Sequence, residues 1–272
     1  MRISYEQLNK IKQEHNVDKI WSYSQLSTYV EHDWLWYLKY LLKVKDVEDS
    51  NIYSFFGGKV HEIMEDYIEG KIEQKDMIVR FENIVEEWKV NHPDLQFPTE
   101  KSQNAYLANM RHYFKNTHYD FTDKKTSVEK FVLTKFKDSE SNPILFQGYI
   151  DLLVYDALSD TFYVSDFKTS AKSSFSGKKL LESSRQLQLY AIGIHQMFRV
   201  PYDKIILRYD LQKYIEISFL QENGKWSKPT LKDRDGWVAD YEGRIYKALE
   251  KMDYDFFEIN EMLEIAKLNN DL

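Results

Sequence analysis

The first 120 residues follow a helical pattern of apolar and polar positions. In the aromatic run SQLSTYVEHDWLWYLKYLL, from Ser24 to Leu42, apolar residues recur at three- and four-residue spacing, which predicts a helix packed in a core. Either Ser22 or Ser24 is placed to cap this helix. Further helices are predicted to start directly after Gly57-Gly58 and to span residues 75–91 and 99–118.

After the first 120 residues, the spacing of apolar positions changes from the helical period to the two-residue period of strands. Apolar residues alternate in two runs, and a third run is β-branched and aromatic. The three predicted strands are Ser127–Phe136, Ile144–Tyr155 and Thr161–Phe167. Because short turns connect them, they predict an antiparallel meander.

In the remainder of the chain, segments with the helical spacing of apolar residues alternate with segments that have the spacing of strands. Its predicted elements are a helix over residues 178–198, strands over 204–211 and 215–220, and a helix over 233–252. This order predicts an α/β fold with a mixed sheet, preceded by a helical lobe. We expect residues 1–120 to form the lobe and residues 121–272 the sheet-containing core, both in one compact unit.

Composition narrows the class of protein. The chain has 272 residues, 43% of them hydrophobic, and no cysteine. Disulfides, cysteine-ligated zinc, cysteine-ligated iron–sulfur clusters and thiol nucleophiles are therefore excluded. No apolar run approaches the ~18 residues of a membrane span, and the first residues lack the apolar stretch of a signal peptide. We expect a cytoplasmic protein without membrane contact.

Charge is unevenly distributed along an acidic chain. The net charge is −7, yet residues 124–137 hold five Lys and one Glu, and residues 167–185 hold four Lys and one Arg against one Glu. These basic windows are either solvated faces or parts of a groove that contacts phosphates. Charge alone does not separate the two interpretations.

Two carboxylates and a lysine occur in neighbouring predicted strands. Asp151 lies within GYIDLLVY, and Asp166 and Lys168 share one face of YVSDFK. The turn at residues 156–160 makes Asp151 and Asp166 near-opposite neighbours. Adjacent carboxylates repel unless a cation lies between them, and a hard divalent ion such as Mg²⁺ or Mn²⁺ suits oxygen ligands. Two carboxylates, a lysine and Mg²⁺ are suited to phosphodiester hydrolysis. The alternative is a salt-bridged edge strand.

Two helical motifs add to this set. Gln186 and Tyr190 are four residues apart and share a face of the helix predicted over 178–198. His61 follows Gly57-Gly58, and its imidazole nitrogen is a candidate third ligand for a two-carboxylate metal site. The alternative for His61 is a hydrogen-bonded residue of the core.

With these motifs the chain resembles the RecB-type nucleases of the PD-(D/E)XK superfamily. The family pattern is S-x-S-x-L, G-x-x-x-H, G-x-x-D, D-x-K and Q-x-x-x-Y, in this order. The chain carries these motifs at Ser22–Leu26, Gly57–His61, Gly148–Asp151, Asp166–Lys168 and Gln186–Tyr190. The resemblance covers roughly residues 20–215, and the order of five motifs makes it specific although each alone is not.

The resemblance implies a fold and roles for individual residues. It implies a restriction-endonuclease-like core with a mixed sheet flanked by helices. It also implies His61, Asp151, Asp166 and the Phe167 backbone carbonyl as metal ligands, with Lys168 as the catalytic lysine. Gln186 and Tyr190 would contact the DNA backbone or brace the site.

The chain departs from many relatives in two respects. His32-Asp33 stands where relatives such as the CRISPR spacer-acquisition nucleases carry a Cys-Pro pair, so no iron–sulfur cluster is expected. A helicase motif such as G-x-x-x-x-G-K-[ST] is also absent, so we expect a free-standing nuclease domain similar to phage and plasmid-borne recombination exonucleases.

The expected function is that of a Mg²⁺- or Mn²⁺-dependent DNA exonuclease that acts on ends or single strands in recombination, repair or phage DNA processing. We expect DNA as partner, a recombination or replication protein as a further one, and a bacterial or phage-infected cell as location. The candidate phosphate contacts are Lys59, Lys135, Lys137, Lys172, Lys178, Lys179 and Arg185. Alternatives are an endonuclease of the same superfamily, an inactive scaffold or DNA-binding subunit, and a helical interaction protein.

Overall fold

The computed structural model describes residues 3–44, 51–137, 141–170 and 178–212, with side chains from residue 185 onward in the last range. The strand predicted over 215–220 and the helix predicted over 233–252 lie outside these residues.

A five-stranded mixed sheet forms the centre of the molecule. The strands are β1 (Trp21–Ser22), β2 (Lys124–Lys137), β3 (Pro143–Asp156), β4 (Thr161–Lys168) and β5 (Ile205–Leu211). Antiparallel pairs β2–β3 and β3–β4 confirm the predicted meander, whereas β1 pairs parallel with β3 and β5 parallel with β4. The mixed sheet confirms the predicted α/β fold class.

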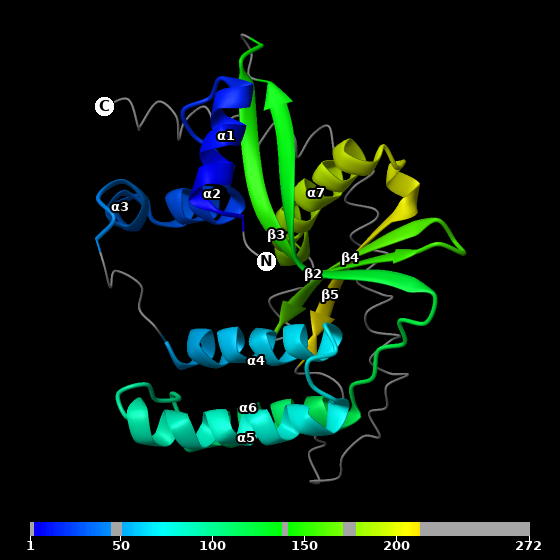
Figure 1. Ribbon diagram of the computed structural model, residues 1–272. Helices are drawn as coiled ribbons and strands as arrows, with labels where there is room; N and C mark the ends of the chain where they lie inside the picture. The colour runs from blue at the N-terminus through cyan, green and yellow to red at the C-terminus, as the bar shows by residue number, and fades with distance from the viewer. Residues whose placement is uncertain (1–2, 45–50, 138–140, 171–177, 213–272) are drawn as a thin grey trace.

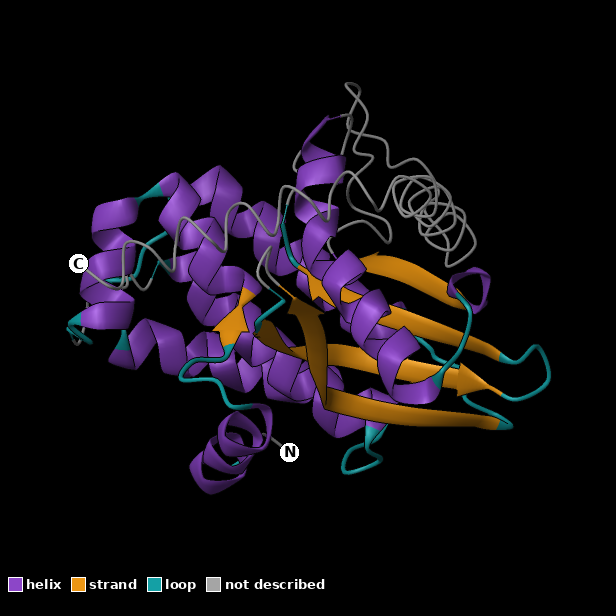
Figure 2. Ribbon diagram, turned by 90° about the horizontal axis from the view of Figure 1, so that it is seen from above, coloured by secondary structure: helices purple, strands orange, loops and turns teal. Residues whose placement is uncertain are grey.

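Helices cover the sheet from two sides. They are α1 (Tyr5–His15), α2 (Tyr23–Glu31), α3 (Asp33–Trp36), α4 (Ile52–Ile68), α5 (Gln74–Asn91), α6 (Glu100–Asn116) and α7 (Lys178–Phe198). Helices α4, α5 and α6 stack on one side of the strands, whereas α7 lies on the other (Figure 1). Figure 2 shows the strands side by side with helices packed over them. Within the described ranges, no helix is both long and apolar enough to cross a membrane.

Helices α4 to α6 and the sheet share an apolar core. Buried residues of the three helices, such as Phe56, Phe81 and Met110, join one cluster with Leu152 of β3 and Phe167 of β4. Burial of such side chains contributes roughly 1.5–3 kcal/mol each. This cluster therefore fixes the helical layer against the strand ends that carry the candidate site.

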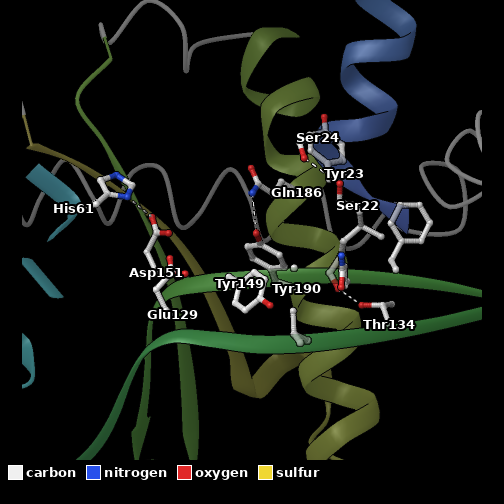
Figure 3. A pocket seen from close by; sticks show the side chains of 15 residues that line it. Ser22, Tyr23, Ser24, His61, Glu129, Thr134, Tyr149, Asp151, Gln186 and Tyr190 are labelled. Atoms are coloured by element: carbon white, nitrogen blue, oxygen red, sulfur yellow. Dashed lines mark hydrogen bonds and ion pairs between the residues drawn. The ribbon is translucent and has the colours of Figure 1, made fainter. Parts of the chain in front are cut away.

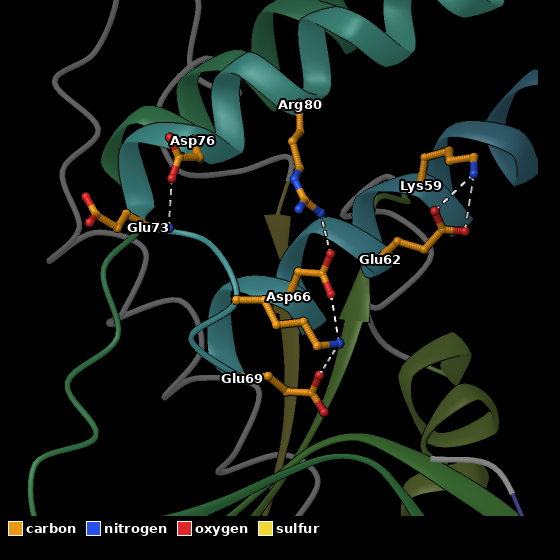
Figure 4. A network of polar contacts seen from close by, with 8 residues as sticks. Lys59, Glu62, Asp66, Glu69, Glu73, Asp76 and Arg80 are labelled. Carbon is orange, nitrogen blue, oxygen red and sulfur yellow. Dashed lines mark hydrogen bonds and ion pairs between the residues drawn. The ribbon is translucent and has the colours of Figure 1, made fainter.

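Polar contacts also tie the helical layer together. Asp66 at the end of α4 accepts hydrogen bonds from Lys71, at 3.0 Å, and from Arg80 of α5 (Figure 4). Exposed pairs of this kind contribute about 0–1 kcal/mol. At the buried end of α6, the Tyr113 hydroxyl donates to Asp210 Oδ2 of β5 at 3.1 Å. The helical layer is thus anchored to the last described strand as well.

The aromatic run from Ser24 is not one continuous helix. Ser22 caps α2, because its hydroxyl accepts from the Gln25 backbone N–H at 3.3 Å. His32 leaves the helical region of backbone angles, and α3 and a π-helical turn over Tyr37–Leu41 follow. The break lets Leu26 and Trp36 reach the same apolar cluster, so packing overrides helical spacing here.

The helix that carries His61 starts earlier than predicted. Its first residue is Ile52, capped by the Asn51 side chain, so Gly57 and Gly58 lie inside α4 and do not precede it. Each interior glycine costs about 1 kcal/mol relative to alanine. Burial of Ile52 and Phe56, with 3% and 0% exposure, offsets this cost.

Strands β2 and β3 change faces midway along their length. Ile150 packs on the α7 side and Leu152 on the α4 side, although residues two apart in a regular strand share a face. Val132 and Val128 of β2 differ in the same way. Glu129, which directly follows Val128, has φ 45°, a left-handed conformation that breaks the alternation. Asp151 and Glu129 therefore lie at the switch point of the sheet.

Candidate active site

Asp151 and Asp166 lie next to each other on paired strands. The last register pair of β3 and β4 is Leu152 with Ser165, and the same register continued by one residue places Asp151 opposite Asp166. The Phe167 backbone N–H donates to Asp151 Oδ2 at 2.7 Å. The hairpin therefore brings the two carboxylates together as the turn length predicted.

Lys168 forms an ion pair with Asp166 inside the sheet. Lys168 Nζ lies 2.5 Å from Asp166 Oδ2, and Asp166 is only 4% exposed. The ion pair of the alternative interpretation is therefore present, but its edge strand is wrong, because β3 and β5 flank β4. Burial of this ion pair costs desolvation free energy, and the second buried carboxylate, that of Asp151, adds to this cost without adding a cation. This arrangement favours a functional site.

His61 reaches the same point from α4. Its Nε2 lies 3.0 Å from the Phe167 backbone carbonyl, and its Nδ1 lies 3.8 Å from Asp151 Oδ2. Burial lowers the pKa of His61, which outweighs the opposing effect of Asp166, so the ring is neutral at neutral pH. A neutral ring that donates from Nε2 keeps an acceptor lone pair on Nδ1, facing the Asp151 carboxylate.

The charged groups shift one another's protonation. Burial and the neighbouring charge of Asp166 raise the pKa of Asp151 well above its ordinary value. Burial opposes the charge of Lys168, yet Asp166 and Asp151 outweigh it and raise the pKa of the ammonium group. Lys168 is therefore held as a cation, while the ionised form of Asp151 is disfavoured.

The donor set fits a hard divalent cation. Asp151 and His61 Nδ1 present two acceptors to each other, and Asp166 adds a second carboxylate on the adjacent strand. A cation among these acceptors would relieve the repulsion that raises the Asp151 pKa. As the side chains stand, no group of three or more His, Asp and Glu in the described ranges is placed to hold a metal ion.

Gln186 and Tyr190 contact each other across from the carboxylates. The Gln186 amide donates to the Tyr190 hydroxyl at 2.8 Å, and both side chains project from α7 toward β3 (Figure 3). A Cβ atom on Gly148 would lie 2.3 Å from Tyr190 Cε1. The glycine of the G-x-x-D motif is therefore needed for the close approach of the tyrosine ring.

We expect Gly148→Ala to lower stability by about 1–3 kcal/mol, because the added methyl group overlaps the Tyr190 ring. It should also lower cleavage, since the ring borders the candidate site. The measurement is urea unfolding together with nuclease rate. The double variant Gly148→Ala/Tyr190→Ala should lose less stability than the sum of the single variants, and strict additivity would contradict the packing argument.

A cavity of about 370 Å³ opens beside Asp151. It is lined from the amino-terminal segment, α4, the β2–β3 hairpin and α7, and includes Tyr23, His61, Asp151, Gln186 and Tyr190 (Figure 3). This volume is at the lower end of the ~300–1,000 Å³ of small-ligand sites. The cavity brings four of the five sequence motifs around one space.

Among the side chains that the structure describes, the basic residues predicted to contact phosphates do not gather around this cavity. Of those with described side chains, Lys59 is paired with Glu62 at 3.0 Å, Lys135 and Lys137 are exposed near the far end of β2, and Arg185 begins the turn of α7 that carries Gln186. None of these four lines the cavity. Lys172 lies outside the described residues, as do the side chains of Lys178 and Lys179.

The sequence motifs did not identify Glu129 as a residue of the candidate site. This residue lines the cavity with His61 and Asp151, and its charge acts on the pKa of both. It was the single acid within the basic window 124–137, and that isolated carboxylate in a strand was the available signal. The left-handed backbone conformation that directs it was not visible in the sequence.

Comparison with known proteins agrees with this fold. A family model of the PD-(D/E)XK nuclease superfamily matches residues 20–262, and the chain therefore belongs to this superfamily. Membership implies metal-dependent hydrolysis of phosphodiester bonds in nucleic acids, in general with a divalent ion such as Mg²⁺ or Mn²⁺. No curated protein matches the chain.

Proposed function

We propose that the protein is a RecB-type, Mg²⁺- or Mn²⁺-dependent DNA exonuclease. One observation carries the proposal: His61, Asp151, the Phe167 carbonyl and the Asp166–Lys168 pair meet at one point, although they come from α4, β3 and β4. The proposed setting is the processing of DNA ends or single strands in recombination, repair or phage replication, in a bacterial or phage-infected cell.

Each residue has a proposed role. Asp151, Asp166, His61 and the Phe167 carbonyl would hold the metal ion, which would polarise the scissile phosphate. Lys168, held as a cation beside the carboxylates, would orient the attacking water and stabilise the charge that develops on the phosphate. Gln186 and Tyr190 border the cavity from α7, where they would position the DNA backbone.

The cavity beside Asp151 supports action on strand ends. It is lined by residues from the start of α2, from α4, from the β2–β3 hairpin and from α7. Its volume of about 370 Å³ suits a single small unit such as one nucleotide of a single strand. A substrate that enters such a space from an end requires no opening of the surrounding elements.

The test is digestion of end-labelled linear single-stranded DNA, of a matched RNA strand and of a closed circle of single-stranded DNA, in Mg²⁺, Mn²⁺ or EDTA. We expect loss of the linear DNA strand alone, only with metal. Lys168→Ala should lower the rate by about 10²–10⁴-fold, because it removes the group that orients the attacking water and stabilises the developing charge.

Each other result changes the assignment. Cleavage of the circle would identify an endonuclease, and preferential digestion of a matched RNA strand would move the substrate class from DNA to RNA. DNA binding without cleavage in any metal would identify a binding subunit. Unchanged cleavage by Lys168→Ala would overturn the proposed roles.

A further inference from the structure

Glu129 is directed toward the site by an unusual backbone conformation. In the β2–β3 register, Val128 pairs with Leu152 and Lys130 with Ile150, so Glu129 stands level with Asp151. Its φ of 45° lies in the left-handed region, which a residue with a Cβ atom rarely adopts. Without this conformation the alternation of β2 would continue and Glu129 would be oriented differently.

Glu129 borders the same space as the proposed metal ligands. It lines the cavity that contains His61 and Asp151, and Figure 3 shows its side chain next to that of Asp151. Glu129 and His61 also line a second cavity, on the α4 side, together with Gly58 and Glu62.

Glu129 adds a third carboxylate beside the adjacent pair Asp151 and Asp166. Carboxylate oxygens are the ligands that Mg²⁺ and Mn²⁺ prefer. Mg²⁺ usually keeps several water molecules in protein sites, and carboxylates around the ion orient them.

We propose that Glu129 is a further carboxylate of the metal site, where it positions the divalent ion by accepting hydrogen bonds from metal-bound water. This inference rests on the proposed function and extends it by one residue. Glu129 acts through the ion and its water, and is therefore a positioning residue.

The experiment measures Mn²⁺ binding directly, by electron paramagnetic resonance of the free ion, in the full chain without nucleic acid. Glu129→Gln should weaken Mn²⁺ binding by about 10-fold or more, the usual cost of removing an outer-shell partner. Glu62→Gln is the matched control, because Glu62 lines the neighbouring cavity but is 63% exposed and paired with Lys59 (Figure 4). This control should bind Mn²⁺ like the wild type.

A second variant separates function from backbone structure. Glycine adopts φ 45° without steric cost, so Glu129→Gly should keep or raise the Tm while Mn²⁺ binding weakens as in Glu129→Gln. Wild-type Mn²⁺ affinity in both variants would overturn the inference and leave the proposed nuclease function intact. A lowered Tm in both variants, with unchanged Mn²⁺ affinity, would assign Glu129 a purely structural role. Absence of Mn²⁺ binding and cleavage in the wild type would overturn the proposed function itself.

Discussion

Replacing Asp151 by asparagine is expected to abolish cleavage and, in EDTA, to raise the Tm. Cleavage should fall by at least ~100-fold, because a proposed metal ligand is lost. Stability should rise because burial and the charge of Asp166 make the ionised carboxylate of Asp151 unfavourable. Asparagine keeps an oxygen that accepts from the Phe167 N–H, so the local hydrogen bond is retained. Each 1 kcal/mol regained raises the Tm by about 2–4 °C.

The stability effect should depend on pH with a defined sign. The pKa of Asp151 in the folded protein lies above the unfolded value of about 3.9. The cost of the ionised carboxylate is therefore present at neutral pH, decreases as pH falls through the folded pKa, and disappears below about pH 4. The Tm difference between Asp151→Asn and the wild type should follow the same course.

Asp94→Asn is the control, because Asp94 is exposed in the turn between α5 and α6. It should change neither cleavage nor Tm. An Asp151→Asn variant that cleaves DNA at the wild-type rate would remove Asp151 from the metal site. A variant with reduced Tm at neutral pH would show that the ionised carboxylate stabilises the fold and that its repulsion from Asp166 is compensated.

Phe56→Ala is expected to cause the largest loss of stability. Phe56 is 0% exposed, and its ring lies 5.4 Å from Trp88 and 5.7 Å from Tyr106, centroid to centroid. Truncation of a buried phenylalanine costs about 3–5 kcal/mol, out of a typical total of about 5–15 kcal/mol. The measurement is urea unfolding followed by circular dichroism and by tryptophan fluorescence.

The same experiment tests the proposal that residues 1–120 and 121–272 form one cooperative unit. The cluster around Phe56 includes Leu152 and Phe167 of the sheet, so the helical lobe and the core should unfold in one transition. Val79→Ala, at a 57% exposed position of α5, should change stability by no more than about 0.5 kcal/mol. Two separate transitions in the wild type would divide the chain into two units.

Local patterns in the sequence determined most elements. Alternation over Ile144–Tyr155 and Thr161–Phe167, with a short turn between them, predicted the β3–β4 hairpin and its register to within one residue. The position of Asp151 near Asp166 follows directly from that register. Helical spacing likewise predicted α5, α6 and α7 to within two residues at each end. These features depend on contacts between residues close in the chain, which a periodic pattern records.

Other features depended on long-range packing. The start of α4 at Ile52, the break at His32 and the parallel pairing of Trp21–Ser22 with β3 all serve contacts with residues far away in the sequence. Propensity predicted none of them, because buried contacts of Phe56 and Trp36 outweigh the cost of interior glycines or of a broken helix.

The residue types of the candidate site could be read from the sequence, but their geometry could not. The motifs identified His61, Asp151, Asp166, Lys168 and Tyr190, since each chemistry requires particular side chains at particular spacings. Only the tertiary structure decided that Gly148 makes room for the Tyr190 ring and that Glu129 stands level with Asp151. The first depends on the close approach of β3 and α7, and the second on a single backbone angle of β2. Neither produces a periodic pattern of residues in the sequence.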